Sequence, residues 1–398
     1  MKTVALRRLS TVPIATGLGL PGNNFKQSDP RYIRTTDIAS PLTLKDDTFV
    51  SQPSEVAARA PVEYGDLLLV SAGASIGKSC LYLSHDPACY AGFLTRVRPE
   101  SLHTGLFLSY WTQSAHFVDQ VQSTAVQATI ENFSASRYKD LRVPVVPNGQ
   151  QKRIVRFLDS ETAKIDDFIT KQQDLIELTK RRLQTWREHA FWGNAVNDPF
   201  INPPDGWLVR RNRHLFEHVD GRSETGEEEL LSVSHITGVT PRSMKNVNMF
   251  EAESTVGYKL VAHDELVINT MWAWKGALGV SEYEGIVSPA YDVYRFYDVE
   301  QTNPWFFDVA YRTAAYVDFM KAHSRGIWKS RLRLYPEVFL RLSSLIPPKA
   351  VQDRLVAENA ERTAEAERLI SCCERALGLL QERRSALITA AVTGQIEV

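Results

Sequence analysis

Two proline-containing stretches, each followed by a long run of helix-forming residues, decide the fold of this 398-residue chain. They read Val-Pro-Val-Val-Pro-Asn-Gly-Gln-Gln-Lys-Arg-Ile at 143–154 and Ile-Pro-Pro-Lys-Ala-Val-Gln-Asp-Arg-Leu at 346–355. The segments that follow, Gln150–Trp192 and Val351–Val392, contain no proline and are rich in Lys, Arg, Glu, Gln, Leu and Ala, which favour helix. We therefore predict two long helices, ending at Gly193 and Gly394.

The apolar residues of these two segments are spaced as in a coiled coil. In the first segment they are Ile165, Phe168, Leu175 and Trp186, and in the second they are Leu369, Cys373, Ala376, Leu380, Leu387 and Ala391. Steps of three and four residues over several turns predict a helix seam that packs against a second helix. At 1.5 Å per residue each helix would be about 60 Å long, a length that suits a spacer.

Beyond the helices, the whole chain contains an internal repeat. Ile38 matches Ile236 at an offset of 198 residues, and Gly65-Asp66-Leu-Leu-Leu matches Asp264-Glu265-Leu-Val-Ile at 199. Ala115–Asp119 matches Ala314–Asp318 at 199, and Pro147 matches Pro348 at 201. An offset that drifts by only three residues indicates an internal duplication.

The segments outside the long helices are punctuated by glycine, proline and short apolar strands. We predict strands near 66–72, 93–97, 265–269 and 291–297, with a helical stretch near 107–121 and another near 305–321. The expected fold is α+β: two similar mixed α/β lobes separated by two long helices that form an antiparallel coiled coil. The corresponding segments are 1–149, 150–193, 194–349 and 350–398.

Composition narrows the classes of function. The formal charge is −1, from 46 Lys and Arg against 47 Asp and Glu, which excludes a uniformly basic coat but allows local basic clusters such as Arg210-Arg211 and Arg325–Arg333. The sequence has no apolar run of the roughly 18–20 residues that a membrane span needs. The cysteines Cys80, Cys89, Cys372 and Cys373 do not form a disulfide framework. We expect a soluble, cytoplasmic protein.

Two motifs invite enzymatic interpretations. Ala72-Gly-Ala-Ser-Ile-Gly-Lys-Ser79 fits a loose phosphate-binding loop, but Cys80-Leu-Tyr-Leu looks like a strand where such a loop requires a helix. Asn202-Pro-Pro-Asp205 has the beginning of an amino-methyltransferase motif, but an aspartate stands where the aromatic residue belongs. We interpret the first as a turn between strands and the second as a linker, and we expect a binding protein with no catalytic residues and no metal site.

In its repeated arrangement of lobes and helices the chain resembles the specificity subunit of type I restriction-modification systems. The resemblance covers nearly the whole chain and rests on the stretches 143–154 and 346–355, on the ending Arg384–Gly394, and on Gly65–Ser71 and Asp264–Thr270. The family's usual Glu-Gln after the prolines is Gln150-Gln151 in one copy and Val351-Gln352 in the other, and no glycine precedes Glu265. These departures would alter contacts with a partner rather than the fold.

The resemblance implies a function and partners. Segments 1–149 and 194–349 would be target-recognition domains that each read one half of a split DNA target, and the two helices would set the unread gap. Each half would recruit one of two methyltransferase subunits, and restriction and translocase subunits would join them. S-adenosylmethionine, ATP and Mg²⁺ would belong to those partners, with no cofactor in this chain. The alternatives are a self-sufficient DNA methyltransferase or P-loop ATPase, and a purely structural coiled-coil scaffold.

Candidate DNA-binding residues lie in turns and loops beside the matched strands. Near the end of the central strand pairs we predict that Lys275 and Asn269 face DNA together with Trp272 and Trp274, with Lys78 and Ser71 in the equivalent places. In the loops around Ile38 and Ile236, arginine can hold phosphate or reach guanine edges. The candidates there are Arg31, Arg34, Thr35, Arg222, Arg242 and Lys245, and a basic cluster near the end of the second lobe adds Lys329 and Arg331.

Changing the helix length tests the spacer. Inserting four residues near Thr179 adds about 6 Å of helix and keeps the apolar seam nearly in phase. Because B-DNA rises about 3.4 Å per base pair, the gap should lengthen by one or two pairs while both half-motifs stay the same. Inserting two residues should rotate Trp186 off the seam and abolish assembly. Methylation mapping measures the recognised motif and its gap in both insertion variants. If the variant with four inserted residues is active with the original gap, the helices do not act as a spacer.

Overall fold

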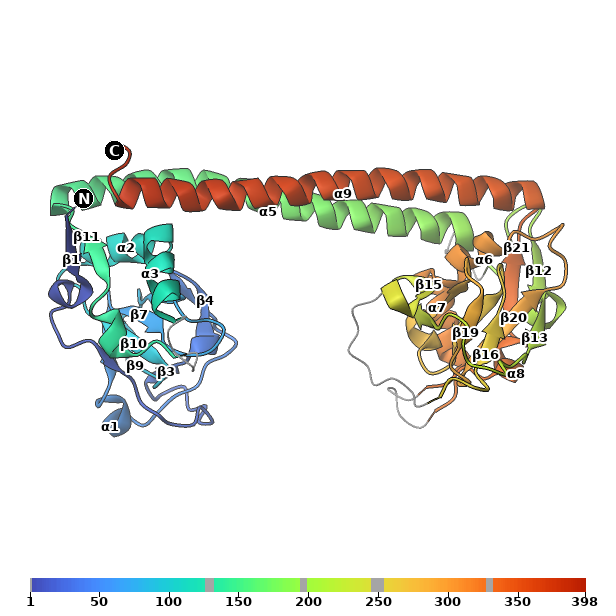
Figure 1. The fold of residues 1–398 in the computed structure, drawn as a ribbon, viewed down its shortest axis with the longest axis horizontal. Helices are drawn as coiled ribbons and strands as arrows, with labels where there is room; N and C mark the ends of the chain where they lie inside the picture. The colour runs from blue at the N-terminus through green and yellow to red at the C-terminus, as the bar shows by residue number, and fades with distance from the viewer. Residues whose placement is uncertain (1, 126–131, 194–198, 245–253, 327–331) are drawn as a thin grey trace. The chain divides into compact units, whose positions relative to one another are not determined.

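The computed structural model describes residues 2–125, 132–193, 199–244, 254–326 and 332–398. The chain forms two compact units: unit 1 comprises Met1–Gln173 with Glu374–Val398, and unit 2 comprises Asp174–Cys373 (Figure 1). Each unit therefore contains one lobe and a part of both long helices. The four segments predicted from the sequence follow chain order instead and separate each lobe from its helices.

The lobe of unit 1 is built around a four-stranded antiparallel sheet. Its strands, in spatial order, are β2 (Ala15–Thr16), β10 (Leu94–Val97), β7 (Leu67–Val70) and β8 (Ser79–Leu81). The smaller strand groups are β1 (Thr3–Ala5) with β11 (Arg142–Pro144), β3 (Arg31–Ile33) with β9 (Ala88–Tyr90) and β6 (Pro61–Val62), and β4 (Ile38–Ser40) with β5 (Thr43–Leu44). The short helices are η1 (Leu6–Leu9), η2 (Thr35–Asp37), α1 (Ser54–Ala57) and α4 (Ala135–Tyr138).

The lobe of unit 2 repeats this plan. Its four-stranded antiparallel sheet runs β13 (Phe216–Val219), β20 (Tyr291–Phe296), β17 (Leu266–Asn269) and β18 (Leu278–Val280). The smaller pairs are β12 (Leu208–Arg211) with β21 (Ser343–Ile346), β14 (Leu231–Ser234) with β15 (Gly238–Pro241), and β16 (Lys259–Val261) with β19 (Gly285–Val287). The short helices are η3 (Asn212–His214), η4 (Arg242–Met244), η5 (Ala273–Lys275) and α8 (Pro336–Phe339). The repeated strand order confirms the duplicated α+β fold.

Each central sheet separates two cores because successive side chains of a strand point to opposite faces. In β7, Leu67 and Leu69 pack into the core shared with the helices, whereas Leu68 and Val70 pack into a second core on the other face. Strand β17 repeats this division in unit 2. Strands buried on both faces read as continuous apolar runs, which explains why these two were visible in the sequence.

The helical stretches predicted near 107–121 and 305–321 are present, and each is a pair of helices. Unit 1 has α2 (Leu102–Trp111) and α3 (Ala115–Ala125), and unit 2 has α6 (Pro304–Tyr311) and α7 (Ala314–His323). Thr313 caps α7 by accepting a hydrogen bond from the Tyr316 N–H at 3.4 Å, and Ser114 accepts one from the Phe117 N–H at 3.4 Å. Because each hydroxyl caps the first turn of the second helix, it marks the boundary between the two helices of the pair.

The long helices α5 (Asn148–Trp192) and α9 (Lys349–Val392) pair antiparallel within each unit. In unit 1 the Arg384 guanidinium lies 2.8 Å from Asp166, and in unit 2 Arg187 donates to Asn359 and Thr363, both at 2.8 Å. Gly193 and Gly394 follow the helices with φ of 85° and 71°, as predicted for helix ends. The antiparallel coiled coil is confirmed.

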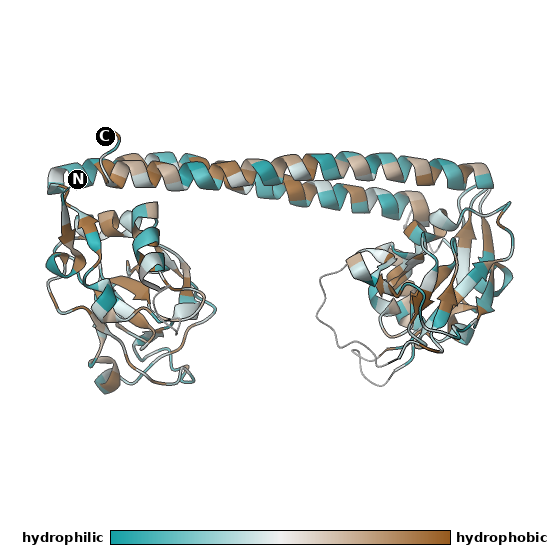
Figure 2. Cartoon of the chain, viewed as in Figure 1, coloured by the Kyte–Doolittle hydropathy of each residue, from teal (hydrophilic) through white to brown (hydrophobic). Residues whose placement is uncertain are grey.

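The predicted seam is correct in part. Ile165 and Cys373 are buried, but Phe168, Leu175 and Leu369 are 55%, 36% and 41% exposed. The half-buried stripe passes instead through the adjacent residues Ile169, Ile176 and Ile370. Figure 2 shows apolar and polar residues alternating along both helices. With apolar residues at neighbouring positions, spacing alone did not identify which of them faces the partner helix.

A buried acidic residue at the start of each central strand is a further duplicated feature. Asp66 accepts from the Glu63 N–H and from two nitrogens of Arg98, all at 2.8 Å, and Glu265 accepts from the Ala262 N–H and from Arg295. The preceding residue has positive φ in both copies, 89° at Gly65 and 65° at Asp264. Aspartate tolerates this region, so the missing glycine leaves the turn unchanged.

Each lobe is also held by the C-terminal turns of a long helix. The Ala115 N–H at the start of α3 donates to Thr389 of α9 at 2.9 Å, within unit 1. In unit 2 the N–H groups of Ala314 and Ala315 donate to Glu188 of α5.

Within the part of the chain that the structure describes, no helix has the length and apolar character needed to cross a membrane.

Candidate nucleic-acid interface

The turns β7–β8 and β17–β18 are matched elements that project different side chains. Leu67 pairs with Leu81 in unit 1 and Leu266 with Val280 in unit 2, so the two turns have equal length. Each has a glycine with positive φ at the same place, 87° at Gly77 and 82° at Gly276. A Cβ at Gly276 would come 3.1 Å from Val317 of α7, so both conformation and space favour glycine. The backbone of the turn is therefore fixed in both lobes.

This register corrects the equivalences that the sequence suggested. At the offset of 199 residues Lys275 matches Ile76 rather than Lys78, and Lys78 matches Ala277. Likewise Ser71 matches Thr270 rather than Asn269. The two turns share a backbone, but their lysines stand at different positions.

Ser71 and Asn269 lie inside the lobes. Ser71 is 3% exposed and its hydroxyl is 2.7 Å from that of Thr95, while Asn269 is 6% exposed and its side-chain oxygen accepts from the Met271 N–H. Their burial argues against direct contact with DNA, and their polar groups stabilise the ends of the central strands instead. The sequence could not distinguish them from exposed residues because both end an apolar strand.

Lys275, Trp272 and Trp274 form one surface feature of unit 2. The two indole rings are nearly parallel, with centroids 6.2 Å apart, and the Lys275 ammonium lies 4.5 Å and 5.0 Å from their centroids. Trp272 is 45% exposed, while Trp274 is half-buried and donates to the Met271 carbonyl at 2.9 Å. The arrangement presents an exposed cation on an aromatic platform, and contact of these three residues with DNA stays a prediction.

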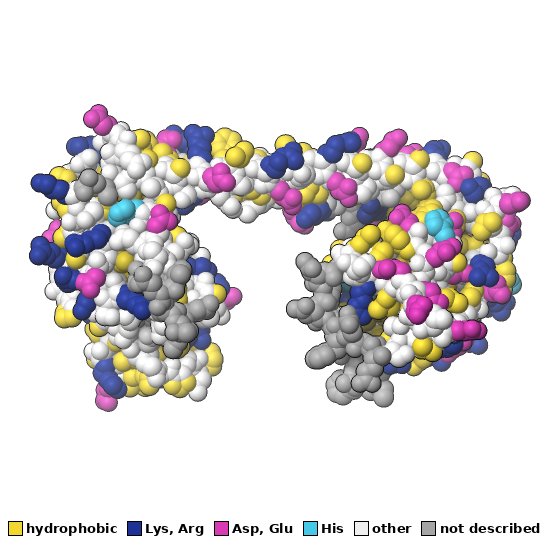
Figure 3. Space-filling model, in the orientation of Figure 1, with side chains coloured by type: hydrophobic (Ala, Val, Ile, Leu, Met, Phe, Trp, Pro, Cys, Tyr) yellow, Lys and Arg dark blue, Asp and Glu magenta, His cyan; other side chains and the backbone are white. Residues whose placement is uncertain are grey.

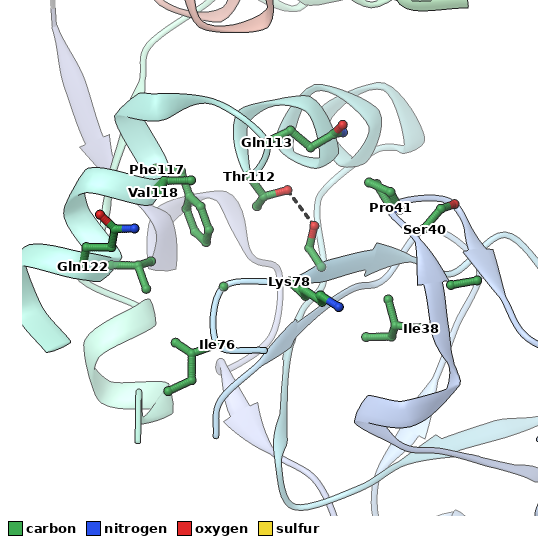
Figure 4. A pocket seen from close by; sticks show the side chains of 14 residues that line it. Ile38, Ser40, Pro41, Ile76, Lys78, Thr112, Gln113, Phe117, Val118 and Gln122 are labelled. Carbon is green, nitrogen blue, oxygen red and sulfur yellow. Dashed lines mark hydrogen bonds between the residues drawn. The ribbon is translucent and has the colours of Figure 1, made fainter. Parts of the chain in front are cut away.

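The matching turn of unit 1 borders a pocket of about 400 Å³. In Figure 4, Lys78 lies between α3, which carries Phe117, Val118 and Gln122, and strand β4 with the following Pro41. Ser79 and Thr112 are joined by a 2.7 Å hydrogen bond along its wall. Lys78 is exposed, so the expected turn between strands leaves one cation at the rim of a largely apolar pocket.

Arg312 occupies the corresponding region of unit 2. It matches Gln113, and it donates to the Ile236 carbonyl at 2.7 Å and pairs with Asp308. Burial raises the pKa of Asp308, against the opposing effect of the Arg312 charge. In unit 1 the Gln113 side chain instead accepts from Arg384 of α9 at 2.9 Å. The two lobes therefore differ in surface chemistry where their backbones agree.

Arg31 and Arg34 are engaged within their own lobe, and Thr35, half-buried, begins η2. The Arg34 guanidinium donates to Asp37 at 2.9 Å and to the Thr48 carbonyl at 2.7 Å, and Asp37 is fully buried. Arg31 donates to the Lys45 carbonyl and lies over the Phe49 ring. These contacts favour a structural role for both arginines.

The loop candidates of unit 2 are Arg222, Arg242 and Lys245. Arg222 is paired with Asp220 at 2.9 Å and donates to the Gly257 carbonyl. The buried Lys259 ammonium, 2.8 Å from Asp292, anchors the same region. Arg242 is half-buried at the start of η4, and Lys245 lies outside the described residues.

Two exposed arginines that sequence reasoning left out of its candidate set lie next to the Trp272–Lys275 turn. Arg325 and Arg333 pair backbone to backbone, with N–O distances of 2.9 Å and 2.8 Å, and the adjacent Leu334 N–H donates to the Thr270 carbonyl. The predicted Lys329 and Arg331 stand between them in the sequence, outside the described residues. Figure 3 shows both basic and acidic side chains on the visible face of each unit.

The motifs with enzymatic interpretations have ordinary structures. Ala72–Ser79 leads into strand β8 rather than a helix, and 202–205 is irregular chain between α5 and β12. Both expectations are confirmed. Among the described residues no group of three or more His, Cys, Asp or Glu side chains is arranged to hold a metal ion.

Comparison with known proteins supports the resemblance noted in the sequence. No family model matches the chain. It is 26% identical over 122 residues to the type I restriction enzyme EcoKI specificity subunit of Escherichia coli K12, which covers 31% of this chain and 25% of that protein. It is 22% identical over 106 residues to the StySPI specificity subunit of Salmonella potsdam, covering 27% and 23%. The aligned region spans about a quarter of the length of these curated relatives.

The fold is similar over nearly its whole length to chains of solved structures. One, from a study of complex assembly and conformational transition of the type I R-M system, has a TM-score of 0.74 at 13% identity and covers 99% of this chain and 98% of that chain. The HsdS subunit from Thermoanaerobacter tengcongensis has a TM-score of 0.54 at 14% identity, with coverage of 99% and 97%. The resemblance to type I specificity subunits is thus confirmed in sequence and in fold.

The contacts of Arg34 predict a structural effect of its removal. Arg34→Ala should lower the free energy of unfolding by about 3 kcal/mol, because it leaves the buried Asp37 carboxylate without its cation. Arg59→Ala, an exposed control in the same lobe, should change it by less than about 0.5 kcal/mol. Urea unfolding measures both. A stable Arg34→Ala variant with an altered DNA motif would instead identify Arg34 as a reader of bases.

Proposed function

We propose that this chain is the DNA sequence-specificity subunit of a type I restriction-modification complex. Each lobe binds one half of a bipartite double-stranded DNA target, and the antiparallel helices fix the distance between the two halves. The chain itself is non-catalytic and acts in the cytoplasm. Target choice resides in the loops and turns of the lobes, and methylation and cleavage reside in partner subunits.

The observation that carries this proposal is the duplicated unit. Each copy has a lobe, a fixed strand turn with its own set of side chains, and parts of both helices of an antiparallel pair. A protein that reads two half-sites at a fixed separation requires two readers on a rigid connection, as dimeric DNA-binding proteins achieve by symmetry. The sequence similarity to two specificity subunits supports the same conclusion independently of the fold.

Partner recruitment is supported by apolar side chains that are exposed at matching positions of the helices. Phe168 and Leu369, 55% and 41% exposed, stand 201 residues apart, and so do Leu178 and Leu379, 59% and 67% exposed. Large exposed apolar side chains are typical of protein–protein interfaces. Because these exposed apolar residues occur at matching positions of both helices, we infer that the chain binds two copies of one partner, the methyltransferase subunit. Restriction and translocase subunits join that assembly.

Cofactors follow from this division of labour. S-adenosylmethionine is assigned to the methyltransferase subunits, and ATP and Mg²⁺ to the restriction and translocase subunits. The β7–β8 turn lacks the following helix whose N-terminus would hold a nucleotide phosphate, which disfavours the ATPase alternative.

Methylation mapping tests the function directly. Cells that express this chain with its methyltransferase subunits should acquire methylation at one bipartite motif, two defined halves around an undefined gap. Cells that express the methyltransferase alone should not. Replacing the second lobe by that of another specificity subunit should change one half of the motif only. The same motif in all three cultures would refute the proposal.

The matched apolar residues predict the stoichiometry. Leu178→Asp should reduce the number of bound methyltransferase subunits from two to one, and the Leu178→Asp, Leu379→Asp double variant should bind none, because a desolvated carboxylate opposes docking. Native mass spectrometry measures the assemblies. Glu177→Gln, an exposed neighbour on α5, is the control and should leave two subunits bound. Two subunits on the double variant would place the partner elsewhere.

A further inference from the structure

Arg325 and Arg333 are an unusual cross-strand pair. They lie directly opposite each other in an antiparallel bridge, and both side chains are exposed. Like charges directly opposite each other destabilise such a pair. Among the residues that the structure describes, no carboxylate forms an ion pair with either guanidinium. An anion between the two arginines would remove the repulsion.

A third cation approaches from the neighbouring turn. The Leu334 N–H donates to the Thr270 carbonyl at 3.0 Å, which joins the arginine bridge to the segment that leads into Trp272 and Lys275. The Lys275 ammonium is supported by the two indole rings and keeps its outer side exposed. Lys275 therefore stands on a turn whose backbone is fixed by Gly276, five residues along the chain from the Thr270 carbonyl that Leu334 contacts.

Two of these cations have uncharged counterparts in unit 1. The hydrogen bond from Leu334 to Thr270 is matched in unit 1 by one from Phe133 to Ser71 at 2.7 Å, which aligns Arg333 with Asn132. Lys275 is aligned with Ile76. Unit 1 thus forms the matching hydrogen bond with an asparagine in place of Arg333 and an isoleucine in place of Lys275, so this contact does not depend on either charge.

We infer that Arg325, Arg333 and Lys275 form an anion site for DNA backbone phosphate in the second half-site, an inference that rests on the proposed function. A phosphodiester oxygen between the guanidinium groups cancels their repulsion, and Lys275 contributes a point charge suited to phosphate rather than to a particular base. The site anchors the second lobe on DNA, and the choice of bases resides in other residues. Changing it therefore alters affinity without altering the recognised motif.

Charge reversal separates this role from a contribution to folding. In Arg325→Glu the repulsive pair becomes an ion pair with Arg333, so the melting temperature should stay the same or rise. The variant, assembled with its methyltransferase subunits, should bind cognate DNA less tightly. The slope of log K against log salt should become shallower by about 0.9 for each phosphate that the variant no longer neutralises. Lys275→Ala should act in the same direction, and Arg211→Ala, an exposed cation on β12, should have no effect.

The outcomes are distinguishable. An unchanged salt slope in Arg325→Glu and Lys275→Ala, with sequence-specific binding intact, overturns the anion site and leaves the proposed function standing. A changed methylation motif in either variant assigns these residues to base reading and also overturns it. If inorganic phosphate competes with binding of the wild-type complex while the variants bind DNA normally, the site holds free phosphate only. Absence of sequence-specific binding by the wild-type complex refutes the function itself.

Discussion

The closure of each lobe by the C-terminal turns of a long helix is the contact on which the other features depend. In unit 1, Ile388, Ala391 and Val392 of α9 are fully buried in the same core as Trp111 and Phe117. In unit 2, Phe191 of α5 stacks on Phe306, with ring centroids 5.3 Å apart. The burial of each of the Ile, Val and Phe side chains contributes about 1.5–3 kcal/mol, which is large beside the marginal stability of a domain.

This closure also positions the turns that the lobes display. Thr389 and Glu188 cap the starts of α3 and α7, and those helices in turn pack against Gly77 and Gly276. In both copies, buried contacts and hydrogen bonds connect the end of the long helix to the displayed turn. The copies differ in the displayed turn, where unit 2 carries two tryptophans and a lysine and unit 1 carries small residues, an isoleucine and a lysine at a different position. A constant scaffold with a variable surface suits a protein whose copies recognise different partners.

Sequence reasoning succeeded where a signal extended over many residues. The duplication and the long helices each depend on patterns of ten or more positions, and each central strand is a continuous apolar run that occurs in both copies. It failed where one residue decides. The break between α2 and α3 depends on a hydroxyl at Ser114, and the seam runs through Ile169 rather than Phe168 because helix phase is set by tertiary packing. For Arg34, whose partner Asp37 is three residues away, the sequence could not tell whether the pair forms.

Unit 1 is discontinuous in the chain, and this has a consequence for biosynthesis. Its core needs residues from Glu374–Val398, whereas unit 2 is one uninterrupted segment, Asp174–Cys373. A ribosome adds about 5–20 residues per second, so the first lobe waits roughly ten to forty seconds after its own synthesis for the helix that completes it. The second lobe meets no such delay. The half that is translated first is therefore the half that finishes folding last, and until then its unclosed apolar face is the part of the nascent protein most in need of a chaperone.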